Sequence, residues 1–119
     1  MFIAGAGGFV GTCCRFLVNR LFLVTWKASF PLATFTINIL GCFIFGLLTG
    51  LLSKSGVISP RWNALFITGF CGGFTTFSTF SYESFNLGMN GEMVQSLIYI
   101  FSSIVVGLLA VWVGVLLTR

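Results

Sequence analysis

Charged side chains are the scarcest groups in this sequence. Only 7% of its 119 residues are charged, and the chain contains no histidine and no aspartate. Its only acidic residues are Glu83 and Glu92. A soluble domain carries about 25% charged residues, so this chain cannot cover its surface with charge. No acid–base pair, nucleophile–base pair or metal cluster can be assembled from these residues, and we expect that the protein is not an enzyme.

Apolar residues are as abundant in this chain as charged residues are scarce. They make up 57% of the chain, which predicts an integral membrane protein. At about 20 residues per membrane helix, the length accommodates four spans and no soluble domain. We predict an all-α fold with a single four-helix transmembrane domain over residues 1–119, its spans covering residues 2–24, 32–52, 62–82 and 93–117.

The segment between the third and fourth predicted spans is rich in turn residues. Glycine and asparagine are typical of loops, and here they stand at Asn86, Gly88, Asn90 and Gly91. We therefore expect a loop region that also contains both glutamates.

Small residues are distributed in a pattern that predicts close helix packing. Glycines four apart let helix backbones approach each other in lipid. Three such pairs occur, at Gly7 and Gly11, Gly46 and Gly50, and Gly69 and Gly73. The cysteines have no zinc or redox spacing and are expected to pack as small apolar residues; they are Cys13, Cys14, Cys42 and Cys71.

Basic residues are divided almost evenly between the two predicted sides of the membrane. The side that holds both termini would carry Lys54, Arg61 and Arg119, and the other side Arg20 and Lys27. Because basic residues set orientation, three against two barely selects one. Insertion in both orientations, with pairing as an antiparallel dimer, would follow; chance is the alternative for counts this small. The net charge of +4 is attributed to these helix ends rather than to nucleic-acid binding.

The third predicted span contains an unusual stretch, GFCGGFTTFSTFS, at residues 69–81. Glycines and hydroxyl side chains interrupt a membrane helix where carbonyls are freed or something polar approaches. Its Phe74, Phe77 and Phe80 are three apart, which predicts one helical face. Aromatic rings have an electropositive edge, and such edges can face a small anion without the grip of a full charge. The stretch therefore predicts a broken helix and a site inside the membrane.

A few polar side chains lie deep in the other predicted spans. Arg15 is costly in lipid, so we expect it in a water-filled cavity of positive potential that favours an anion. Asn38 needs a partner in a dry setting, either another helix or a ligand. Ser102 and Ser103 accompany Tyr99 in the fourth span, and membrane serines often bond back to their own helix.

On these residues the sequence resembles the Fluc (CrcB) family of small fluoride channels over nearly its whole length. The resemblance is carried by GGFVGTCCRF at 7–16, TFTINILG at 34–41 and, most specifically, the stretch at 69–81. It implies an antiparallel, dual-topology homodimer in the prokaryotic inner membrane with two fluoride pathways. Fluoride that enters acidified cells as neutral HF would leave passively through them. The chain departs from the family at Ala33, where glycine is usual, and at Gly107, where some members have serine.

The resemblance also implies roles for individual residues. Phe77 and Phe80 would line each pathway as a ring pair, and Asn38 would donate a hydrogen bond to fluoride. Backbone carbonyls of Gly72 and Thr75 would hold a central structural sodium ion. The rest of the pathway would consist of polar and charged side chains, namely Thr34, Ser78, Tyr99, Ser103, Glu83 near an entrance and Arg15 in an aqueous vestibule.

Two other functions are compatible with a small four-span protein. A dual-topology exporter of cationic drugs needs a membrane-embedded glutamate, and the first span has Arg15 and no acid. The other function is that of a structural or assembly subunit held by glycine packing. This function would not explain the presence of Asn38, Arg15 and the hydroxyl and aromatic residues.

Overall fold

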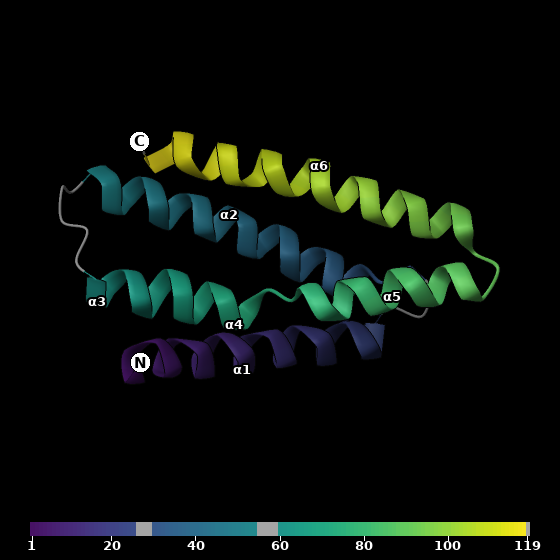
Figure 1. Cartoon of the computed structure of the whole chain (residues 1–119), viewed down its shortest axis with the longest axis horizontal. Helices are drawn as coiled ribbons and strands as arrows, with labels where there is room; N and C mark the ends of the chain where they lie inside the picture. Colours follow the sequence, from purple (N-terminus) through teal and green to yellow (C-terminus); the bar gives the residue numbers. More distant parts are fainter. Residues whose placement is uncertain (26–29, 55–59, 119) are drawn as a thin grey trace.

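The described part of the chain consists of helices and short connections. A computed structural model describes residues 1–25, 30–54 and 60–118, and its regular structure in these ranges is entirely helical (Figure 1). The elements are α1 (Phe2–Thr25), α2 (Leu32–Lys54), α3 (Pro60–Trp62), the π-helix η1 (Asn63–Cys71), α4 (Gly72–Phe74), α5 (Phe77–Met89) and α6 (Met93–Thr118).

Long apolar helices account for three of the four predicted spans. Among the described residues, three helices are long and apolar enough to cross a membrane, over Phe2–Phe22, Leu32–Leu52 and Met93–Thr118. They correspond to the first, second and fourth predicted spans. The helix α1 begins, and α6 ends, at the same end of the bundle (Figure 1).

The third predicted span is built differently from the other three. Its helical turns run from η1 through α4 and resume in α5, with extended backbone between them. Thr75 has φ −84° and ψ 157°, and Thr76 has φ −147° and ψ 123°. The predicted interruption is therefore present, and it is visible in Figure 1 as a stretch without helix between α4 and α5.

The predicted end of this span is wrong. The helix α5 continues to Met89, so Asn86, Gly88 and Glu83 are helical rather than part of a loop. The helix ends at Met89, and the turn that follows contains Gly91, whose φ of +80° is a left-handed conformation that glycine adopts readily. The connection to α6 is consequently shorter than expected.

Glycine contacts hold α1 against η1 and α4. A Cβ atom at Gly7 would collide with the Leu65 carbonyl, and one at Gly11 with the Phe70 carbonyl. A Cβ atom at Gly73 would lie 2.5 Å from the Gly8 carbonyl oxygen. These contacts join backbone to backbone without intervening side chains, which is the close approach that small residues permit between membrane helices.

The same kind of packing joins α2 to α6. A side chain at Gly46 would meet the Val111 carbonyl, and one at Gly50 would meet the Thr118 hydroxyl. All three predicted glycine pairs thus lie at helix contacts. Of the four cysteines expected to pack as small apolar residues, Cys71 is buried, Cys14 and Cys42 are half-buried and Cys13 is exposed.

Candidate functional site

The helix break is fixed by one side chain from α2. The Asn38 amide donates from Nδ2 to the Thr76 carbonyl oxygen at 3.2 Å, and its Oδ1 accepts from the Thr76 backbone N–H at 3.0 Å. Both backbone groups of Thr76 are therefore satisfied by one amide, as they would be by a neighbouring strand. Extended backbone is tolerated in a membrane protein only where its polar groups find such partners.

Threonine side chains close the two helix ends at the break. The Thr76 hydroxyl accepts from the Thr79 backbone N–H at 3.3 Å and so caps the start of α5, a role for which threonine is well suited. On the other side, the Thr75 hydroxyl and backbone N–H both donate to the Cys71 carbonyl, at 2.8 and 2.9 Å. Gly41 makes room for this arrangement, because a Cβ atom there would collide with the Thr75 methyl group.

These hydrogen bonds leave two carbonyls without their regular helical donors. In a continuous α-helix the Thr76 N–H would bond the Gly72 carbonyl and the Thr79 N–H the Thr75 carbonyl. Here the first N–H goes to Asn38 and the second to the Thr76 hydroxyl. Gly72 is also exposed, with open space where its side chain would be. The break therefore offers carbonyl oxygen to a cation at the surface of the chain.

An aromatic row leads from the break into the bundle. The Phe77 and Phe80 rings are 6.1 Å apart, and the Phe80 and Tyr99 rings are 5.0 Å apart at an angle of 58°. Phe77 is 80% exposed, whereas Tyr99 is completely buried. The single helical face predicted for the three phenylalanines is wrong. Phe74 lies before the break, where it is buried and stacks on Phe70, because the extended residues interrupt the helical register.

A polar group follows the aromatic row. The Tyr99 hydroxyl donates to Glu83 Oε1 over a long 3.4 Å, and the Thr34 side chain lies beside the same carboxylate. Thr34 is 2% exposed. Three helices, α2, α5 and α6, thus contribute one side chain each to the same cluster, which the distant sequence positions of these residues do not reveal.

The remaining predicted residues are less closely connected. Ser78 is exposed, with its hydroxyl 3.4 Å from that of Thr76. The Ser103 hydroxyl is buried and has no hydrogen-bond partner among the described residues, whereas Ser102 bonds back to the Ile98 carbonyl of its own helix. Arg15 is half-buried, and its Nε has no partner in the described part of the chain.

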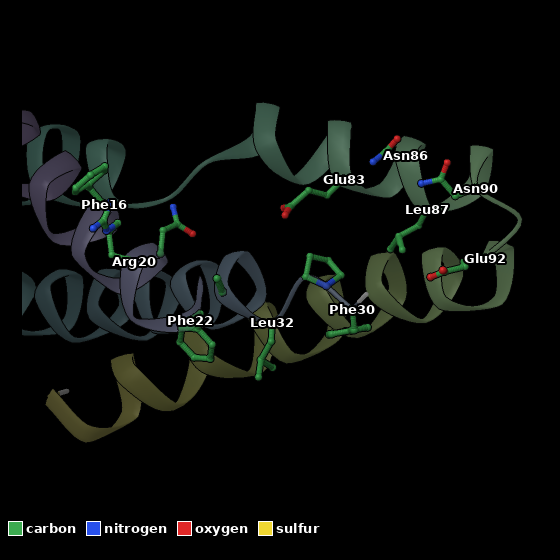
Figure 2. A pocket seen from close by; sticks show the side chains of 13 residues that line it. Phe16, Arg20, Phe22, Phe30, Leu32, Glu83, Asn86, Leu87, Asn90 and Glu92 are labelled. Atoms are coloured by element: carbon green, nitrogen blue, oxygen red, sulfur yellow. The ribbon is translucent and has the colours of Figure 1, made fainter. Parts of the chain in front are cut away.

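Two cavities adjoin this group of residues. One, of about 530 Å³, lies at the break and is lined by Asn38, Gly72, Thr75, Phe77 and Phe80 among others. The other, of about 570 Å³, lies at one end of the bundle, where Glu83, Asn86 and Glu92 line it (Figure 2).

The end cavity differs in one respect from the predicted vestibule. Arg20 lines it, and Arg15 does not. The Arg20 guanidinium carbon lies 5.9 Å from the centre of the Phe16 ring. In the sequence, Arg20 has the charge and position of a topology signal at a helix end, and nothing there indicates that it lines a cavity.

The two departures from the family pattern have distinct surroundings. Ala33 lines the end cavity. Gly107 is buried in α6, and a Cβ atom there would lie 3.5 Å from the Cys42 sulfur. A Cβ atom at Gly107 would therefore be in ordinary van der Waals contact with α2, so the glycine is not required there by a close backbone approach.

Comparison with known proteins gives a family match over almost the whole chain. Residues 2–115 match the family described as "CrcB-like protein, Camphor Resistance (CrcB)". The chain belongs to the CrcB family. Similar relatives include a protein of Azobacteroides pseudotrichonymphae, 44% identical over all of this chain and 95% of its own length. Another, of Chlorobium phaeobacteroides, is 43% identical over all of this chain and 92% of its own.

The names of these relatives describe one activity. A third relative, a protein of Methylobacillus flagellatus, is 46% identical over 94% of this chain and 88% of its own length. All three relatives are named "Fluoride-specific ion channel FluC". Ion channels are a non-enzymatic class. Membership of the CrcB family, together with the long apolar helices, confirms the predicted location as a multi-pass protein of the inner membrane.

Proposed function

We propose that the chain forms a fluoride-selective channel through which fluoride leaves the cytoplasm passively. The observation that carries the proposal is the helix break, where Asn38 bonds both backbone groups of Thr76 beside the Phe77–Phe80 ring pair. The names of the CrcB relatives support fluoride as the ion. HF formed outside in acid would cross the membrane, ionise inside and leave as fluoride.

The ring pair would provide the selective part of the pathway. Ring edges are weakly electropositive, so Phe77 and Phe80 can attract a small anion and still release it, as conduction requires. The Asn38 amide has two N–H donors, and one of them is used on the Thr76 carbonyl. The second would donate to fluoride as it loses water.

Polar side chains would continue the pathway toward solvent. The Phe80 ring contacts Tyr99, and Tyr99 reaches Glu83, which lines the end cavity. We propose that this cavity is the entrance and that the other pathway groups are Thr34, Ser78 and Ser103, with Arg15 in an aqueous vestibule. The unpartnered Ser103 hydroxyl favours such a role, since a buried polar group without a partner is costly.

The freed carbonyls of Gly72 and Thr75 suit a structural sodium ion. Both oxygens have lost their regular helical donors, and oxygen ligands are preferred by hard cations. When bound, the ion would supply positive charge that holds the break together and attracts anions. The residues of the break keep these carbonyls from accepting the hydrogen bonds of a continuous helix.

A second copy of the chain, in the opposite orientation, would complete the channel. Phe77 is 80% exposed, and Gly72 faces open space. Groups that contact a conducted or bound ion are expected to be enclosed, and an antiparallel partner would cover both residues. The near-even distribution of basic residues supports insertion in both orientations. Each four-helix domain over residues 1–119 would then contribute to two pathways.

Fluoride release from liposomes tests the proposal. Purified protein is reconstituted, a potassium ionophore is added, and fluoride and chloride release are followed with selective electrodes in parallel. Fast fluoride release with negligible chloride release is expected. No fluoride release from well-folded protein would contradict the proposal and favour a different solute or a partner chain. Epitope tags found on only one side of the membrane would contradict the dual-topology part alone.

A further inference from the structure

Two buried serines connect α5 to α6 close to the aromatic row. The Ser96 hydroxyl of α6 donates to the Ser84 carbonyl of α5 at 2.7 Å. The Ser84 hydroxyl donates in turn to the Phe80 carbonyl, one helical turn earlier, at 2.8 Å. Both serines are nearly inaccessible, at 4% and 8% exposure. We call these two bonds the serine relay: they share the residue Ser84, through its carbonyl and its hydroxyl respectively, and the second ends at the backbone of a proposed pathway residue.

The relay lies next to a second contact between the same helices. Ser96 and Tyr99 are three residues apart in α6 and therefore share a face. The Tyr99 ring contacts the Phe80 ring at 5.0 Å. One turn of α6 thus holds α5 in two places, at the Ser84 carbonyl by a hydrogen bond and at the Phe80 ring by an aromatic contact.

Such a tether is directional, whereas apolar packing is not. A hydrogen bond weakens steeply away from linear geometry, so the bond from the Ser96 hydroxyl to the Ser84 carbonyl resists rotation of α5 about its axis. Serine that bonds to the carbonyl four residues earlier also bends a helix locally. Neither effect is needed for insertion into lipid, where alanine would fit equally well at both buried positions.

We propose that Ser96 and Ser84 are positioning residues that set the direction of the Phe80 ring in the fluoride pathway. This inference rests on the proposed function for its effect on flux, but the ring orientation can be tested separately. The serines touch no ion themselves. They act through the backbone of α5, which carries Phe77 and Phe80 at its start.

The test is Ser96→Ala, with 4-fluorophenylalanine incorporated at position 80 for ¹⁹F NMR in detergent. We expect a displaced or broadened fluorine resonance and roughly a threefold loss of fluoride flux, the size typical of one hydrogen bond between membrane helices. Ser96→Thr keeps the hydroxyl and should restore both readings. Ser102→Ala is the matched control, because its hydroxyl bonds only within α6, and it should change neither.

The outcomes separate the two proposals. An unchanged resonance in Ser96→Ala, or an equal change in Ser102→Ala, would overturn the relay. If Ser96→Ala does not fold, Ser96→Cys keeps the volume with a weaker donor, and the resonance must then move in that variant. If the unsubstituted protein carries no fluoride, the proposed function fails, while the fluorine spectra still decide whether the serines orient the ring.

Discussion

The two parts of the interrupted membrane segment are held in opposite ways. Before the break, η1 and α4 contact α1 through glycines, with backbone against backbone at Gly11 and Gly73. After the break, α5 is held by side chains, among them Ser96 and Tyr99. The first part therefore depends on the absence of side chains and the second on their chemistry.

This difference separates support from function within one span. Glycine contacts involve no polar side chain, and they fix the position of a helix only through the fit of one backbone against another. Hydrogen bonds and ring contacts fix rotation as well, which a site for a small ion needs. The division falls at Thr75 and Thr76, where the backbone is extended and Asn38 supplies its partner.

The largest effect is expected where the glycine contacts are filled. Gly11→Val places a branched side chain against the Phe70 carbonyl and the Phe74 N–H, which are backbone atoms that cannot move aside. Overpacking typically costs about 1–3 kcal/mol and can cost more, so most of the protein should be lost from the monodisperse fraction in size-exclusion chromatography.

Gly5→Val is the control for this substitution on the same helix. Apart from Gly5's own stretch of α1, no atom of the described residues lies within 4 Å of a Cβ placed there, so the variant should behave like the unsubstituted protein. If both variants were equally stable, the packing described for α1 would be wrong.

A smaller effect is expected from breaking the Asn38 contact. Asn38→Leu leaves the Thr76 N–H and carbonyl unpaired, and each unpaired buried group lowers the free energy of unfolding by about 1–3 kcal/mol. The thermal unfolding midpoint should fall, and fluoride flux should fall on the order of 100-fold, as expected for a loss of about 3 kcal/mol.

Asn38→Asp removes the donor of this contact and keeps the acceptor. The side chain still accepts from the Thr76 N–H but no longer donates to the Thr76 carbonyl, and a carboxylate within a membrane span is costly, so an unfolding midpoint no higher than that of Asn38→Leu is expected. An Asn38→Leu variant with an unchanged midpoint would show that the break does not need the amide.

The smallest effect is expected from Tyr99→Phe. This change keeps the ring against Phe80 and removes the long 3.4 Å bond to Glu83. A typical intramolecular hydrogen bond contributes about 0.5–1.5 kcal/mol, and this one is long, so flux should fall only about two- to tenfold. Tyr99→Ala, which also removes the ring, should lower flux further. Equal flux in the two variants would mean that the ring contact has no part in conduction.

Much of this arrangement was predictable from local sequence. The stretch at 69–81 predicted the break because glycines and hydroxyls are out of place in an apolar helix. The glycine pairs predicted where helices meet, and Asn38 was expected to need a partner in a dry setting. These inferences use spacing and residue type, which the sequence states directly.

Other features depend on contacts that the sequence does not state. Asn86 and Gly88 are typical turn residues, yet they are helical because the left-handed conformation falls at Gly91. Phe74 keeps the spacing of the other phenylalanines but lies across the extended residues. Ser96 and Tyr99, which donate to Ser84 and Glu83, are on α6, and these contacts follow from how α5 and α6 pack rather than from any motif.

The central claim is that the ring pair beside the break conducts fluoride. It is tested most directly by fluoride release from liposomes containing Phe77→Ile/Phe80→Ile, compared with the unsubstituted protein at equal reconstituted amounts. The account predicts background release from the variant, although it elutes as the same oligomer in size-exclusion chromatography. Release as fast as that of the unsubstituted protein would contradict the claim.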